Sequence, residues 1–251
     1  MTIDSILRAV DSTLTSDDER TYFLIHESRY KTILGYLRDL GNFGDLTKPI
    51  KILDVGCFPY HMGAALEMMG AEVWGIASRH EPIKNKRIAI LNIETDRFPY
   101  KNNFFDLVLC SEVVEHLPHS PVPAIREMYR VTKPGGHILI TTPNINRSIN
   151  QGKMLLGKAP VYSIDAFLEN EGRGSNLYHR HNREYTLGEL TKLARHAGWQ
   201  LTKASHFVSY TPFRRRNRHD NPLLWTAKLT NFLLTRAIPR LADTLLVIGQ
   251  K

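Results

Sequence analysis

Short apolar runs alternate with helical patterns over nearly a hundred residues between Pro49 and Pro143, and this alternation constrains the fold most strongly. The apolar runs cover residues 51–55, 72–77, 88–93, 105–110 and 137–143, and the helical patterns cover 61–70 and 120–132. Parallel strands need long connections, and a helix usually supplies them. The pattern therefore predicts an α/β fold with a doubly wound, mostly parallel sheet and helices on both faces. In such a sheet, ligands bind beyond the carboxyl ends of the strands.

The segments on either side of this region give a provisional domain organisation. Residues 1–48 are predicted to form a helical cover over the ligand-binding side of the domain, with a capping box at Ser16–Glu19 and a stop at Gly41. Residues 49–251 form the main domain. Within it, residues 144–182 lack periodicity and predict either a functional lid on the substrate side or a tolerated surface insertion. A helix over 186–199 and a last strand over 243–251 complete the prediction.

Charge and cysteine content narrow the partners and the compartment. The 251 residues carry a formal net charge of +8, which favours an anionic partner without selecting one and also fits a solubilising surface. The two cysteines, Cys57 and Cys110, are too few for a disulfide framework. The first residues do not form a signal peptide, and no apolar run predicts a transmembrane segment. We therefore expect a cytoplasmic protein.

Three motifs in this order resemble the class I (Rossmann-like) S-adenosylmethionine-dependent methyltransferases. They are KILDVGCFPYHMG (51–63), NFFDLVLCSEVVEHL (103–117) and VTKPGGHILITTPN (131–144), and HNREYTLGELTKLARHAGW (181–199) matches more loosely. The resemblance implies a seven-stranded sheet, S-adenosylmethionine as cofactor, and methyl transfer as the reaction. A catalytic cysteine is not needed for that chemistry, because the sulfonium already activates the methyl group.

The first motif departs from the family pattern of an acidic residue followed by spaced glycines. Asp54 and Gly56 match its start, and with Cys57 they are assigned to the cofactor site by the resemblance. Phe58 and Tyr60 stand where further glycines are usual, and we assign them to the same site. Each aromatic ring is either hydrophobic filler or a face that attracts the sulfonium cation.

The remaining cofactor contacts are expected after the later strands. Ala77 occupies the place of the acidic residue that usually binds the ribose, and Ser78, Arg79 or Glu81 could replace it. The resemblance places Asn92 and Ile93 beside the adenine, where an amide can both donate and accept. The plain alternative for Asn92 is a turn residue. Ser111 and Glu112 follow the fourth strand, where the family closes around the cofactor.

An E-x-x-E-H group, formed by Glu112, Glu115 and His116, carries the candidate catalytic chemistry. A similar group binds a metal in small-RNA 2′-O-methyltransferases with a further histidine downstream, and His179 and His181 lie in a matching segment. Three roles stay open. The group could hold a divalent cation, Glu115 and His116 could only order the loop, or His116 or His181 could act as a general base. We assign Glu115, His116 and His181 as catalytic and leave the metal unknown.

Function is predicted as methyl transfer to a hydroxyl oxygen of a small molecule or glycan precursor. One alternative is RNA 2′-O-methylation, which fits the basic charge, and nucleic acid is the less favoured partner. Another is a catalytically silent binding protein, which fits the missing glycines and ribose acid. Arginines at 214, 215, 216 and 218, followed by an apolar helical pattern over 223–238, indicate either peripheral membrane or anionic-substrate contact, or a core helix beside a solvated loop.

Overall fold

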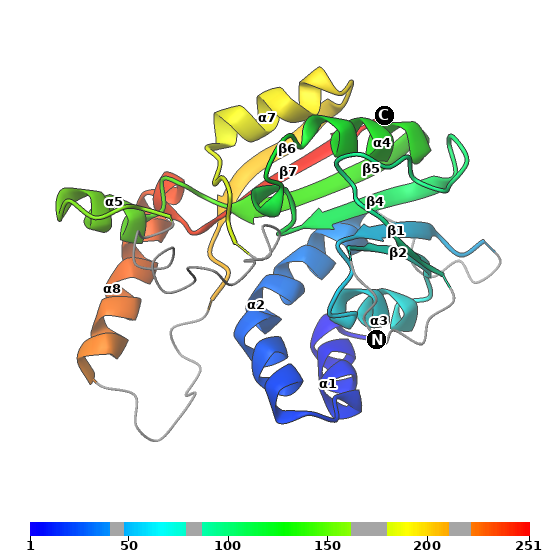
Figure 1. Cartoon of the computed structure of the whole chain (residues 1–251). Helices are drawn as coiled ribbons and strands as arrows, with labels where there is room; N and C mark the ends of the chain where they lie inside the picture. Colours follow the sequence, from blue (N-terminus) through cyan, green and yellow to red (C-terminus); the bar gives the residue numbers. More distant parts are fainter. Residues whose placement is uncertain (41–47, 79–86, 162–179, 211–221) are drawn as a thin grey trace, which may run out of the picture.

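The chain folds around one seven-stranded sheet, as the sequence predicts (Figure 1). The structure is a computed structural model that describes residues 1–40, 48–78, 87–161, 180–210 and 222–251. The strand order is β3-β2-β1-β4-β5-β7-β6. The strands from β3 to β5 pair in parallel, and β7 runs antiparallel to both of its neighbours. The chain order reverses between β1 and β4, and this switch point is where parallel sheets of this kind open a crevice.

The strands follow the predicted apolar runs closely. They are β1 (Lys51–Val55), β2 (Glu72–Ala77), β3 (Ile88–Ile90), β4 (Phe105–Ser111), β5 (Thr132–Pro143), β6 (Gln200–Phe207) and β7 (Thr244–Gln250). The helices are α1 (Ile3–Thr13), α2 (Asp17–Leu40), α3 (His61–Met68), α4 (Val122–Val131), α5 (Ser148–Leu155), α7 (Leu187–His196) and α8 (Pro222–Ala237), with short 3-10 turns η1 (Val114–His116) and η3 (Pro239–Leu241). Within these described ranges, no helix is both long and apolar enough to cross a membrane.

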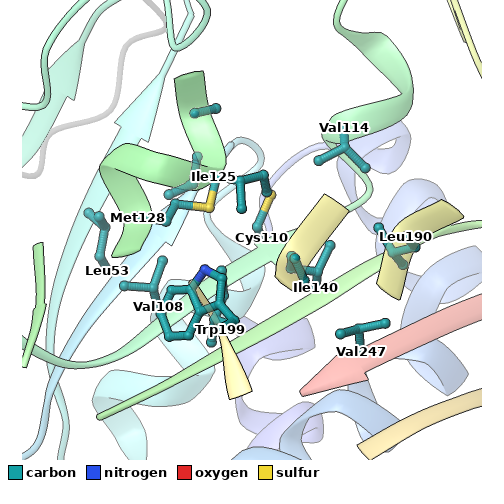
Figure 2. Close-up of a cluster of buried hydrophobic side chains, with 14 of the residues drawn as sticks. Leu53, Val108, Cys110, Val114, Ile125, Met128, Ile140, Leu190, Trp199 and Val247 are labelled. Carbon is teal, nitrogen blue, oxygen red and sulfur yellow. The ribbon is translucent and has the colours of Figure 1, made fainter. Parts of the chain in front are cut away.

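Two apolar cores lie on opposite faces of the sheet. On one face, α4 and α7 pack against strand side chains that include Val108 and Ile140, and Trp199, which follows α7, joins this core (Figure 2). On the other face, α1, α2 and α3 bury side chains such as Leu34 and Leu66 against the sheet. Burial of apolar surface on both faces explains why β1 and β4 read as nearly continuous apolar runs. Helices on both faces confirm the predicted layer arrangement.

Several elements differ from the sequence prediction. β3 ends at Ile90, whereas the apolar run continues to Ile93, and β5 begins at Thr132 and includes the glycines that predict a turn. The amphipathic helix α1 and the edge strand β6 are additional elements. Residues 144–182 are not wholly irregular, because α5 lies within them.

The N-terminal helices cover the same face as α3, and α2 also reaches the carboxyl ends of the strands through Tyr22 and Arg29. That residues 1–48 form a cover over the cofactor side stays a prediction. Gly41 and the predicted boundary at residue 48 adjoin positions 41–47, which lie outside the described residues, so this boundary stays a prediction. Cys57 and Cys110 are both buried free thiols.

Candidate active site

A cavity of about 690 Å³ opens where β1, β2 and β4 end. Small-molecule sites usually have volumes of roughly 300–1,000 Å³. The predicted residues that line it are Gly56, Phe58, Ala77, Asn92, Ile93, Glu112 and His116. Those that lie outside its lining are Asp54, Cys57, Tyr60, Ser111, Glu115 and His181. A second cavity of about 670 Å³, between α4 and α7, contains none of the predicted site residues.

Gly56 is required by the shape of the turn after β1. Its φ of +80° is in the left-handed region, and a Cβ there would lie 2.3 Å from Cγ2 of Val113. Glycine therefore lets the turn and the β4 loop approach each other at the cavity wall. The amides of Gly56 and Cys57 both donate to the carbonyl of Ile76, at 2.8 and 3.1 Å. These two amides are therefore used within the sheet rather than by a ligand.

The two aromatic residues of the first motif separate into different roles. Phe58 lines the cavity and is 52% exposed, so its ring is accessible to a bound cation. The hydroxyl of Tyr60 donates to Oε1 of Glu67 at 3.0 Å, and its ring lies against Gly63, where a Cβ would be 2.3 Å away. Tyr60 thus packs against α3 rather than facing the cavity. The interpretation as hydrophobic filler therefore fits Tyr60 better than it fits Phe58.

Asp54 and Cys57 are buried behind the cavity wall. Asp54 is 4% exposed, and burial raises the pKa of its carboxyl to about 7. Cys57 packs under β2 against Gly75. Burial raises the pKa of the Cys57 thiol to about 12, and burial also raises that of Cys110. Burial therefore disfavours a thiolate at either cysteine near neutral pH. This agrees with the predicted chemistry, which needs no catalytic cysteine.

The ribose and adenine positions are largely apolar. Ala77 and Ser78 line the cavity, whereas Arg79 and Glu81 lie outside the described residues. The side-chain oxygen of Asn92 accepts from the amide of Glu94 at 3.0 Å, which is a turn-forming contact. The side-chain carbonyl and the backbone amide of Asn92 are therefore both used by the turn, so contact with an adenine would fall to Ile93.

Glu112 links the cavity to α2 through a partly buried ion pair. Arg29 Nη1 lies 3.1 Å from Glu112 Oε2, with side chains 11% and 16% exposed. The Thr141 hydroxyl donates to Glu112 Oε1 at 3.0 Å, so the Ser111 hydroxyl, 2.9 Å away, must donate to Thr141. Ser111 therefore orders Glu112 rather than facing the cavity. Arg29 was not predicted from the sequence, and its Nε is buried with no partner among the described residues.

Glu115, His116 and His181 converge beside the cavity. One ligand-type atom from each lies within 4.8 Å of the others. The carboxyl of Glu115 is buried, Oε2 accepts from the Thr142 hydroxyl at 2.8 Å, and Oε1 has no hydrogen-bond partner among the described residues. Burial and the nearby charge of Glu112 raise the pKa of Glu115. His116 Nδ1 donates to the carbonyl of Arg180 at 3.1 Å, because a carbonyl can only accept.

The predicted neighbour His179 falls outside the described residues, so only His181 represents the downstream histidine. The rings of His116 and His181 are nearly perpendicular, with centroids 4.9 Å apart. The structure therefore brings together the three residues assigned as catalytic, although they are separated by as many as 66 positions.

The residues present fit S-adenosylmethionine. Gly56 forms a close-packed wall, the exposed ring of Phe58 suits a sulfonium, and apolar side chains such as Leu91 and Ile93 suit an adenine. Arg29 holds Glu112 at the cavity wall, and its buried Nε has no partner among the described residues. The polar groups that normally hold the ribose are the sparsest part of the site.

The comparisons agree with this geometry. A family model described as a methyltransferase domain matches residues 26–204. A ubiquinone biosynthesis O-methyltransferase of Proteus mirabilis is 32% identical over 39% of this chain and 43% of its own length. The Aliivibrio fischeri (strain MJ11) enzyme of the same name is 29% identical over 57% of this chain and 61% of its own length. The chain thus spans about half the length of these curated relatives.

Solved structures support the same fold. A SAM-dependent methyltransferase from Archaeoglobus fulgidus superposes with a TM-score of 0.56 at 16% identity, covering 92% of this chain and 99% of that one. An S-adenosylmethionine-dependent methyltransferase from Mesorhizobium loti gives 0.53 at 17% identity, covering 86% and 96%. The family match covers well over half of the chain. The resemblance of the motifs is confirmed, and the chain belongs to the S-adenosylmethionine-dependent methyltransferase family, with S-adenosylmethionine as its cofactor.

Proposed function

We propose that this chain methylates a hydroxyl oxygen of a small molecule. The observation that carries the proposal is the convergence of Glu115, His116 and His181 beside a cavity of cofactor size. The curated relatives named O-methyltransferases support oxygen as the acceptor atom. The names describe those relatives. For this chain they only support the proposed acceptor atom, because the matched segments cover part of each protein.

S-adenosylmethionine, when bound, supplies a methyl group that a sulfonium has already activated. Gly56, Phe58, Ala77 and Ile93 would form the walls that hold it, and Arg29 would keep Glu112 in place at the cavity wall. The chain must then align the acceptor oxygen with the methyl group and exclude water, because alignment supplies much of the rate. Tyr22 from α2 closes one wall of the cavity and contributes to this exclusion.

His116 is the residue best placed to take the hydroxyl proton. It lines the cavity, and its Nδ1 hydrogen is committed to the Arg180 carbonyl, which leaves Nε2 as the basic atom of the neutral ring. Glu115 Oε1 lies 3.9 Å from that Nε2. Burial and Glu112 favour the neutral form of Glu115, and an imidazolium at this distance would favour its carboxylate, which would in turn stabilise the imidazolium.

A divalent cation is the second interpretation of the same three side chains. A carboxylate and two imidazoles fit zinc or a similar transition ion, and a cation there would draw the acceptor hydroxyl toward ionisation. We favour the proton-transfer role. Activity after exhaustive EDTA treatment decides between the two interpretations. Full activity would exclude a role for a cation. Loss of activity that is restored by Zn²⁺ or Mg²⁺ would show that a cation is required.

The main test is transfer of a labelled methyl group from S-adenosylmethionine to a panel of acceptors. Phenols and aliphatic alcohols should be methylated on oxygen, and amines should not. Turnover of glycan precursors would instead identify a glycan precursor as the acceptor. Turnover of RNA that falls steeply with salt would favour 2′-O-methylation. A dissociation constant of about 1 mM corresponds to a binding free energy of roughly 4 kcal/mol. If calorimetry detects no binding at about 1 mM S-adenosylmethionine, the chain is a catalytically silent binding protein instead.

An anionic membrane surface is proposed as a further partner. Figure 1 shows α5 and α8 beyond the end of the sheet toward which β4 and β5 point, and the Ser148 hydroxyl donates to Asn231 between them. Leu155 and Leu156 are 88% and 75% exposed, and Leu233 is 57% exposed. No acidic residue occurs in 148–161 or 222–242, whereas both segments carry Lys or Arg. Exposed leucines with basic neighbours suit an interfacial contact.

Vesicle sedimentation tests this contact. The chain should bind phosphatidylcholine vesicles that contain phosphatidylglycerol and should not bind phosphatidylcholine alone. Leu155→Asp with Leu156→Asp should abolish binding while methylation of a water-soluble acceptor continues. The predicted arginine cluster at 214–218 lies outside the described residues, so the proposal rests on α5 and α8.

A further inference from the structure

Glu184 is a buried carboxylate that the assigned chemistry does not use. Its side chain is fully buried and accepts three hydrogen bonds from different parts of the chain. Arg147 Nη2 and His181 Nδ1 lie 2.8 and 3.1 Å from Oε1, and Asn150 Nδ2 lies 3.0 Å from Oε2. An unpaired buried carboxylate is costly, so a group held by three donors indicates a site built to keep the charge.

The state of Glu184 determines the state of His181. The guanidinium of Arg147 and the side-chain amide of Asn150 can only donate, so each oxygen of Glu184 accepts from one of them, and the positive charge of Arg147 favours the carboxylate. The group is therefore a carboxylate near neutral pH and can only accept. His181 Nδ1 must then carry the hydrogen, which leaves Nε2 as the lone-pair nitrogen of the neutral ring.

The same segment is fixed to the catalytic loop. The amides of Asn182 and Arg183 donate to the carbonyl of Glu115 at 2.7 and 3.1 Å. The side-chain amide of Asn182 donates to the carbonyl of His116 at 2.7 Å. These contacts hold the backbone around His181, but they leave its ring free to turn about its side-chain bonds. Among the described residues, Glu184 is the hydrogen-bond partner that fixes the ring itself.

We propose that Glu184 is a positioning residue that holds His181 as its Nδ1-protonated tautomer, with Nε2 presented to the cluster of Glu115 and His116. Arg147 and Asn150 keep the carboxylate in place, and Asn150 belongs to α5. The insertion therefore contributes to the active site through Glu184. This inference rests on the proposed methyl transfer for its catalytic consequence, but the tautomer itself does not depend on that reaction.

The test is ¹⁵N NMR of the histidine rings in the full-length chain, with the His181 signals assigned by their loss in His181→Gln. The wild-type protein should show His181 with hydrogen on Nδ1. Glu184→Gln should give a mixture of tautomers and lower kcat about 10- to 100-fold with unchanged KM for S-adenosylmethionine, as is typical when a carboxylate behind a functional histidine is lost. Glu189→Gln is the control, because Glu189 pairs with Arg183 rather than with His181.

Two results would overturn the proposal. One is a wild-type His181 with its hydrogen on Nε2, a measurement that stands even if Glu184→Gln does not fold. The other is a folded Glu184→Gln variant with wild-type tautomer and wild-type kcat. A chain that methylates nothing but shows the expected tautomers would refute the proposed function and leave the positioning of His181 intact.

Discussion

The two halves of the candidate active site differ in the kind of chemical group that forms them. The cofactor half, along the ends of β1, β2 and β3, is shaped mainly by backbone and apolar groups such as Gly56, Ala77 and Ile93. The acceptor half, after β4 and β5, contains several ionisable groups, including the partly buried Glu112 and the buried Glu115 and Glu184. Binding by shape tolerates the loss of individual polar contacts, whereas positioning of charge does not. The cofactor half can therefore lack the acidic residue that usually binds the ribose, whereas the acceptor half needs its Glu and His side chains close together.

The largest expected effect comes from His116 in the acceptor half. His116→Gln should lower kcat by about 10²- to 10⁴-fold, because loss of a positioned general base usually costs that much. Cofactor affinity should stay near wild type, since the cofactor half is untouched. Steady-state kinetics and calorimetry check the two parts. His119→Gln is the control, as its side chain is 78% exposed and lies outside the cavity lining. Wild-type kcat in His116→Gln would remove His116 from proton transfer.

The next effect concerns shape in the cofactor half. Gly56→Ala should weaken S-adenosylmethionine binding at least about tenfold, because left-handed backbone strain of roughly 1–2 kcal/mol adds to a Cβ contact of 2.3 Å with Val113. Gly135→Ala is a matched control: its φ of +78° resembles that of Gly56, but no atom lies within 4 Å of the added Cβ. Equal cofactor affinity in the two variants would show that the tight turn does not shape the site.

A third prediction uses the buried acid of the cofactor half. Burial raises the pKa of Asp54 in the folded chain to about 7, so folding favours its neutral form. This group therefore costs no stability below about pH 4, and the cost grows as pH rises to about 7, where it levels off at no more than about 4 kcal/mol. Asp54→Asn should remove that dependence.

Urea unfolding of wild type and Asp54→Asn between pH 5 and 8.5 measures the difference. The variant should gain stability over wild type as pH increases, and the two curves should approach each other toward pH 5. A difference that does not change with pH would mean that Asp54 is ionised throughout, and that the shape-built half of the site contains a compensating charge.

The sequence predicts the fold well because burial on both faces makes each central strand a continuous apolar run. It misses β6, whose residues are partly exposed and therefore show no such run. It finds Gly56 through a local motif but misses Arg29, whose partner Glu112 is 83 positions away. Such a pairing depends on how α2 packs against the sheet. Glu184 could have been found locally, because it follows His181 by three residues, a spacing that suits a carboxylate–imidazole contact.

The smallest expected effect decides what Phe58 does. Phe58→Leu keeps an apolar side chain but removes the aromatic face. If the ring attracts the sulfonium, S-adenosylmethionine should bind about two- to fivefold more weakly, which corresponds to a cation–π contribution of roughly 0.5–1 kcal/mol at an exposed site. S-adenosylhomocysteine, a neutral thioether, should bind as it does to wild type. Calorimetry with both ligands measures the difference.

Tyr60→Phe is the control for that measurement, because it removes only the hydroxyl that donates to Glu67 on α3. Affinity for both ligands should be unchanged in this variant. Equal weakening for the two ligands in Phe58→Leu would instead identify Phe58 as hydrophobic filler. The cofactor half would then bind by shape alone, and all the charge-based selectivity of the site would reside around Glu112, Glu115 and Arg29.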